Sequence, residues 1–146
     1  MKKLFTSFAL CACAVFSIAQ DGPVPEVHIK KEVFKMQTPG EYQVMISITC
    51  NNATVNSFAS YKEDLDSMGG EVEVTSINTG GANFSYVDGK VKFLWSSLNL
   101  HGTMVISYLV QDNAEWDIDQ PGTFKYVYNN AVAEVKIKKE DIVYPR

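Results

Sequence analysis

The acidic segment 111–121 holds the densest group of side chains that could do chemistry. A tryptophan lies among four carboxylates, and these five residues are Asp112, Glu115, Trp116, Asp117 and Asp119. If the segment is extended, Glu115, Asp117 and Asp119 project from one side at intervals of about 6.8 Å. Tryptophan is enriched among the residues that dominate protein interfaces. The sequence therefore predicts a binding site made of these five residues, with Trp116 as its anchor.

Two other interpretations of this segment stay open. Carboxylate oxygens are ligands for calcium, but the segment lacks the sixth-position glycine and the closing glutamate of the twelve-residue calcium loop. We therefore predict no metal site, and a cation on these carboxylates is kept as an alternative. The other interpretation is structural: an acidic loop crosses between sheets, and Trp116 fills one end of the fold.

The residue types that catalysis requires are sparse. Cys50 continues an apolar strand face, which predicts a buried thiol with no cation or base nearby to activate it. His28 and His101 are the two histidines, and they cannot complete a zinc site without two further ligands. The chain has neither a Gly-x-Ser-x-Gly nucleophile motif nor a phosphate-binding glycine loop. The sequence therefore predicts a protein that is not an enzyme and has no cofactor.

The first nineteen residues predict a cleaved export signal. Lys2 and Lys3 precede an apolar run that ends at Ile18, and small residues stand just before Gln20, where a signal peptidase would cut. Cleavage before Cys13, as in a lipoprotein, is disfavoured because it leaves an apolar run of under about ten residues. We therefore expect a signal peptide over 1–19 and a periplasmic or extracellular location.

Residues 20–146 are enough for one domain with one core. The net charge of the chain, −4, argues against binding to nucleic acid or to anionic lipid headgroups. Cys50 is the only cysteine outside the expected signal, so no internal disulfide can form. No second apolar run of about 20 residues follows, so no transmembrane segment is expected after cleavage.

Alternating polar and apolar residues predict β-strands through most of the domain. Residues 41–50 alternate cleanly, and 103–111 are apolar on both faces, which is typical of a central strand. We expect Asn51-Asn52 to break the first of these patterns and 99–102 to form a loop before the second. Residues 54–61 predict another strand, followed by a short irregular or helical turn that Gly69-Gly70 closes.

Two dipeptides predict tight hairpins. Asp88-Gly89 and Asn129-Asn130 suit two-residue turns in which both central residues have positive φ. The resulting registers pair Tyr86 with Val91, Phe84 with Phe93, Ala82 with Trp95, Tyr128 with Ala131, Tyr126 with Ala133, Phe124 with Val135 and, on the other face, Lys125 with Glu134. Because polar residues occupy the reverse faces, we predict that these rings form the core and not an exposed sugar-binding platform. Eight or nine short strands with such turns predict a two-sheet antiparallel sandwich, immunoglobulin-like or jelly-roll-like.

The chain resembles the cohesin-type and related immunoglobulin-like modules of secreted bacterial proteins. The resemblance covers 55–110 and lies in the segment 55–59, the strand 72–74, the aromatic hairpin 84–95 and the apolar strand 104–110. It implies a jelly-roll-like fold and a role in attachment or protein recognition; cohesins serve as receptors for dockerins. No recognition residue is carried over from this resemblance.

These observations predict an exported, non-enzymatic β-sandwich module. We expect it to bind another envelope or extracellular protein, or to pack into an envelope assembly, through a sheet edge or the loops at one end. The alternative is a carbohydrate-binding module whose partner is a glycan.

Overall fold

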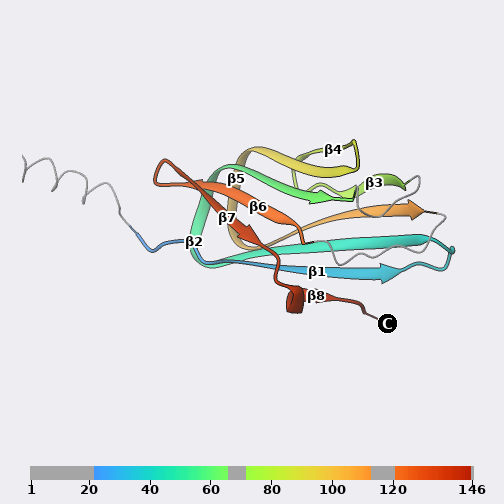
Figure 1. Ribbon diagram of the computed structural model, residues 1–146. Helices are drawn as coiled ribbons and strands as arrows, with labels where there is room; N and C mark the ends of the chain where they lie inside the picture. Colours follow the sequence, from blue (N-terminus) through green and yellow to red (C-terminus); the bar gives the residue numbers. More distant parts are fainter. Residues whose placement is uncertain (1–21, 66–71, 113–120, 146) are drawn as a thin grey trace, which may run out of the picture.

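The computed structural model describes residues 22–65, 72–112 and 121–145, and most of these residues are in β-strands (Figure 1). The strands are β1 (Val27–Lys35), β2 (Glu41–Asp64), β3 (Val72–Asn78), β4 (Asn83–Val87), β5 (Lys90–Asp112), β6 (Thr123–Tyr128), β7 (Ala131–Lys136) and β8 (Ile142–Val143). A 3-10 turn, η2 (Lys139–Asp141), precedes β8. The prediction of an all-β fold is confirmed.

The eight strands of the described residues belong to one hydrogen-bonded sheet. One path through it runs β3-β5-β2-β1-β8, while β4 pairs with β5, and β6 pairs with β2 and β7. The β1–β8 pair is parallel and the other pairs are antiparallel. Strand pairing in the described residues therefore shows one mixed sheet, while the two-sheet antiparallel sandwich stays a prediction.

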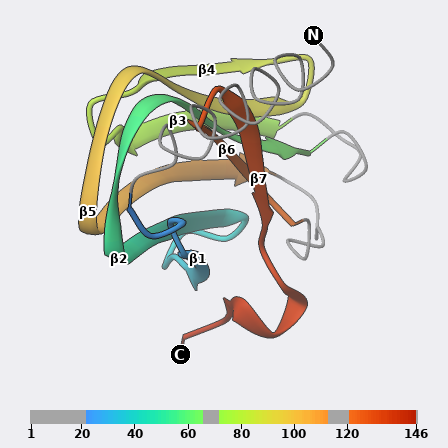
Figure 2. The ribbon, with the colours of Figure 1, turned by 90° about the vertical axis from the view of Figure 1, so that its left-hand side faces the viewer.

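The sheet has two halves because β2 and β5 are long and bend together. Each of these two strands begins in one half of the sheet and ends in the other. Figure 2 shows both strands running along one side of the molecule from one half to the other. The β1 half holds β1, β3, β8, residues 41–50 of β2 and 103–112 of β5. The β6 half holds β4, β6, β7, residues 55–64 of β2 and 90–100 of β5. Neither the break predicted at Asn51-Asn52 nor the loop predicted at 99–102 interrupts these strands.

Irregular pairing produces the bend. Cys50 pairs with Gly102 and Val55 pairs with Leu100, so β2 has more residues than β5 between these two pairs. The extra residues of β2 are held from the side, because the Asn52 side chain donates to the Val24 carbonyl (2.8 Å) and accepts from the Glu26 amide (2.9 Å). A bulge of this kind curves a sheet without ending its strands.

Both predicted hairpin turns are confirmed. Positive φ angles occur at Asp88 (52°), Gly89 (74°), Asn129 (49°) and Asn130 (60°), as a type I′ turn requires. The β4–β5 and β6–β7 registers pair Phe84 with Phe93, Tyr86 with Val91, Phe124 with Val135, Tyr126 with Ala133, Tyr128 with Ala131 and Lys125 with Glu134.

The space between the two halves is the core. Phe93, Trp95, Phe124 and Tyr126 are buried in it, and Phe84, Tyr86 and Tyr128 pack against it at its margin. The Phe93 ring contacts four other rings, with centroid distances of 5.1 to 6.4 Å. Cys50 is also buried. The predictions that the rings form the core and that the thiol is buried are therefore confirmed.

Candidate functional site

The predicted binding segment lies almost wholly outside the described residues. Glu115, Trp116, Asp117 and Asp119 fall in 113–120. Asp112 ends β5, where its backbone pairs with Val72 of β3. The prediction that these residues bind a partner therefore stays a prediction. Two other groups of side chains in the described residues have the character of a site, one buried and one exposed.

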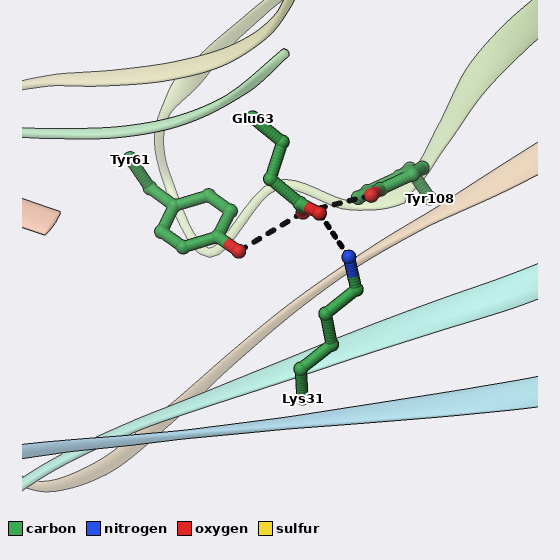
Figure 3. A network of polar contacts seen from close by, with 4 residues as sticks. All are labelled: Lys31, Tyr61, Glu63 and Tyr108. Carbon is green, nitrogen blue, oxygen red and sulfur yellow. Dashed lines mark hydrogen bonds and ion pairs between the residues drawn. The ribbon is translucent and has the colours of Figure 1, made fainter. Parts of the chain in front are cut away.

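The buried group is an ion pair with two tyrosines (Figure 3). The Lys31 ammonium donates to Glu63 Oε1. The Tyr61 and Tyr108 hydroxyls both donate to Glu63 Oε2, at 2.9 and 2.7 Å. Both charged side chains are fully buried. Charge-assisted hydrogen bonds to both carboxylate oxygens offset part of the cost of taking the ions out of water.

This network joins strands from both halves of the sheet. Lys31 comes from β1 and Tyr108 from the second part of β5, while Tyr61 and Glu63 come from the second part of β2. Each reaches the network because it lies on the inward face of its strand. The Tyr61 ring lies against Gly122, at a position where any Cβ atom would collide with it. The network therefore fixes how the two halves face each other.

Burial and the neighbouring Glu63 carboxylate raise the pKa values of Tyr61 and Tyr108 well above the usual value of 10.0. Both hydroxyls therefore stay protonated and keep donating at neutral pH. The residue types, an amine, a carboxylate and two phenols, are those of acid–base chemistry, but full burial closes them to substrates. We assign the network a structural role.

The sequence analysis missed this network, although a signal for it is present. In β1, Lys31 continues the inward face of Ile29 and Val33, and in β2, Glu63 continues the inward face of Ala59 and Tyr61. A charged residue in an apolar alternation is buried only with a partner. An inward lysine on one strand and an inward glutamate on another therefore predict a buried ion pair between them.

The exposed group lies on the outer face of the β6 half. Four apolar side chains there are open to solvent: Phe58 (70%), Leu94 (42%), Val127 (38%) and Val132 (70%). They line an open groove of about 470 Å³ together with polar residues that include Ser60 and Lys125. We call this surface the outer groove. Contiguous apolar surface of this kind marks binding sites on soluble proteins.

Strand pairing explains why these side chains meet. Leu94 of β5 and Lys125 of β6 both pair with Ser60 of β2, so their side chains share its outward face. Phe58 precedes Ser60 on the same face, at an irregularity where Ser57 pairs with Leu98 and Ala59 pairs with Trp95. The Val127 amide donates to the Ser57 hydroxyl (3.1 Å), which holds β6 against this irregularity.

Lysines flank the groove. Lys62 of β2 pairs directly with Lys92 of β5. Lys125 of β6 pairs with Ser60, which lies two residues before Lys62 on β2. The pKa of Lys62 is lowered chiefly by the positive charge of Lys92 and then by the partial burial of Lys62 itself. The charges of Lys125 and Lys90 lower it further. Like charges placed opposite one another across strands are destabilising. Lys125 also lies 3.8 Å from the Glu134 carboxylate of β7. We call Lys62, Lys92 and Lys125 the lysine cluster; an anionic partner would relieve the repulsion between Lys62 and Lys92.

The described residues contain no group of three or more metal-ligating side chains that could hold an ion. They also contain no helix that is long and apolar enough to cross a membrane. His28 is exposed on the outward face of β1, and His101 lies in β5, where its ring contacts the Ala53 carbonyl.

Breaking the buried ion pair should destabilise the fold strongly. Replacing Lys31 with Met leaves the Glu63 charge buried without its cation, which costs about 3–5 kcal/mol in comparable pairs. Lys30→Met is the matched control, because Lys30 pairs with Glu32 at the surface (3.3 Å) and such pairs contribute about 0–1 kcal/mol. Urea denaturation measures both variants. Equal losses in the free energy of unfolding would contradict the assignment.

The two buried tyrosines should make the fold sensitive to alkali. In the unfolded chain they ionise near pH 10, whereas the folded protein keeps them protonated at higher pH. Their contribution is therefore present below about pH 10 and is lost as pH rises further, by up to about 1.4 kcal/mol per pH unit for each tyrosine. The double variant Tyr61→Phe, Tyr108→Phe should show a shallower decline when urea denaturation is followed between about pH 9 and pH 11. A decline as steep as that of the wild type would refute this role.

Comparison with known proteins identifies the fold but no family. No family profile matches the chain, and no curated protein matches its sequence. Among solved structures, it is similar to a GH20 exo-β-N-acetylglucosaminidase from Vibrio harveyi, with 8% identity and a TM-score of 0.54 over 83% of this chain and 19% of that one. The chain thus spans about a fifth of that enzyme's length.

Two small domains are also similar. The chitin-binding domain of a hyperthermophilic chitinase from Pyrococcus furiosus has 17% identity and a TM-score of 0.50, covering 77% of this chain and 98% of that one. The seventh ScaB type I cohesin from Pseudobacteroides cellulosolvens has 12% identity and a TM-score of 0.43, covering 81% and 88%. Identities this low show a shared fold alone.

Proposed function

We propose that this chain is an exported, non-enzymatic β-sandwich module that binds another protein through the outer groove. The observation that carries the proposal is the exposed apolar surface around Phe58, flanked by the lysine cluster. Phe58 and Val132 gain little burial on folding, and the side-by-side lysines repel one another. A partner that covers the apolar side chains and faces the lysines would bury the first and neutralise the second.

The side chains of the groove favour a protein over a glycan. Sugar-binding surfaces on flat sheets present planar rings, but here Phe58 is the single aromatic residue among the four exposed apolar side chains. The rings of Trp95 and Tyr126 border the groove and are themselves buried. Leu94, Val127 and Val132 offer branched aliphatic surface, which suits the apolar side chains of a protein.

A second candidate function is carbohydrate binding. The similarity to the chitin-binding domain from Pyrococcus furiosus favours it, because 98% of that domain matches 77% of this chain in fold. Fold similarity alone is a weak reason to transfer a ligand. A glycan array probed with the mature protein separates the two candidates: specific sugar binding that Phe58→Ala abolishes would support the second.

The export signal predicted over 1–19 supports a partner in the periplasm or outside the cell. Binding by Trp116 and the acidic residues around it is a further part of the proposal. Trp116 lies outside the described residues, so its share in binding rests on the sequence argument.

The outer groove should be required for partner capture and dispensable for folding. Phe58→Asp places a charge in the groove without disturbing the core, because the side chain is largely exposed. The matched control is Ile77→Asp, an exposed apolar residue (54%) on β3 in the other half. We expect affinity capture of tagged protein from its native envelope to lose its specific partners with Phe58→Asp and to keep them with Ile77→Asp. Both variants should melt within a few degrees of the wild type.

The opposite pattern would overturn the proposal. If Phe58→Asp retains every partner while the control loses them, binding uses the β1 half. If Phe58→Asp unfolds the protein, Phe58→Ser replaces it in the same assay, since that change removes the ring without adding a charge.

A further inference from the structure

The chemistry of the outer groove specifies its ligand closely. Phe58, Leu94, Val127 and Val132 favour apolar side chains opposite them. The facing Lys62 and Lys92 favour negative charge beside those side chains, while Lys125 already faces Glu134 at 3.8 Å. The chain as a whole carries a net charge of −4, so this basic surface stands out against the rest of the molecule. A protein segment that combines carboxylates with large apolar residues would match it.

The chain carries such a segment in its own sequence. Residues 112–119 read Asp-Asn-Ala-Glu-Trp-Asp-Ile-Asp, with four carboxylates around Trp116 and Ile118 and no basic residue. The groove and this segment are therefore complementary in charge and in apolar character. A second copy of the chain therefore supplies a segment that could bind the groove.

We propose that the outer groove of one copy binds the acidic segment 112–119 of a second copy. This inference rests on the proposed function and names the partner. Because the groove and the segment are different surfaces, the contact is heterologous, and each bound copy still offers a free groove or a free segment. Repeated contacts produce a linear assembly of copies, joined head to tail.

The spacing of the charges is compatible with this contact. Alternate residues of an extended segment lie about 6.8 Å apart, which sets the distance between Glu115, Asp117 and Asp119 if they are extended. Residues opposite each other on neighbouring strands lie about 4.5–5.5 Å apart and diagonal ones about 7–8 Å apart, which sets the spacing within the lysine cluster. The flexible lysine side chains can cover the difference. Trp116 would then enter the groove beside Phe58.

Complementary variants of the full mature chain test this assembly directly. Phe58→Asp damages the groove and keeps the segment, whereas Trp116→Ala damages the segment and keeps the groove. In sedimentation velocity at low salt, we expect the wild type and the Ile77→Asp control to form higher oligomers. Each of the two variants should be monomeric alone. Mixed together they should form a one-to-one dimer that grows no further, because only one groove and one segment are intact.

Salt provides a second readout of the same mixture. The affinity of the mixed dimer should fall by about tenfold or more at about 1 M salt, where the Debye length is about 3 Å. A wild type that is monomeric at every concentration, or a mixture that forms no dimer, would overturn the inference. If the wild type is monomeric but Phe58→Asp still loses its captured partners, the occupant is another protein and the proposed function stands. If captured partners are also unaffected, both proposals fail.

Discussion

The buried Lys31–Glu63 ion pair is the constraint on which the rest of the structure depends. Two charges lie in a space without solvent, and the fold tolerates them because Tyr61 and Tyr108 hold the second carboxylate oxygen. These side chains come from β1, β2 and β5, so the pair forms only when β2 and β5 have bent and the two halves face each other. Cys50 is the one cysteine of the described residues and is free, so these polar contacts and the surrounding rings hold the arrangement of the sheet there.

In the second part of β2, the inward side chains stabilise the fold and the outward side chains form the candidate recognition surface. Ala59, Tyr61 and Glu63 point inward to the core, while Phe58 and Lys62 point outward. The strand therefore buries a charge and exposes a large ring, the reverse of the usual pattern. The inward charge has a structural explanation in the network. The outward ring has none within the described residues, and this contrast is why we place recognition on the outer face.

Much of the fold could be predicted from the sequence because its signals are local. Turn chemistry at Asp88-Gly89 and Asn129-Asn130 fixed two registers correctly. The bend could not be predicted, since continuity of β2 past Asn51 depends on pairing with distant β5. The strand over 54–61 was predicted, but the outer groove was not, since it depends on the pairing of both Leu94 and Lys125 with Ser60 of β2. The segment around Trp116 lies outside the described residues, and the predicted site there stays a prediction.

Photo-cross-linking in cells that make the protein tests most directly whether the outer groove is the recognition surface. A benzophenone amino acid would be placed at position 58, 94 or 132 in the groove, or at position 77 or 30 in the β1 half, and cross-linked products would be separated by mass. The account predicts discrete protein adducts from the three groove positions and none of comparable yield from the other two. Adducts confined to positions 77 and 30, with an unreactive groove, would contradict it.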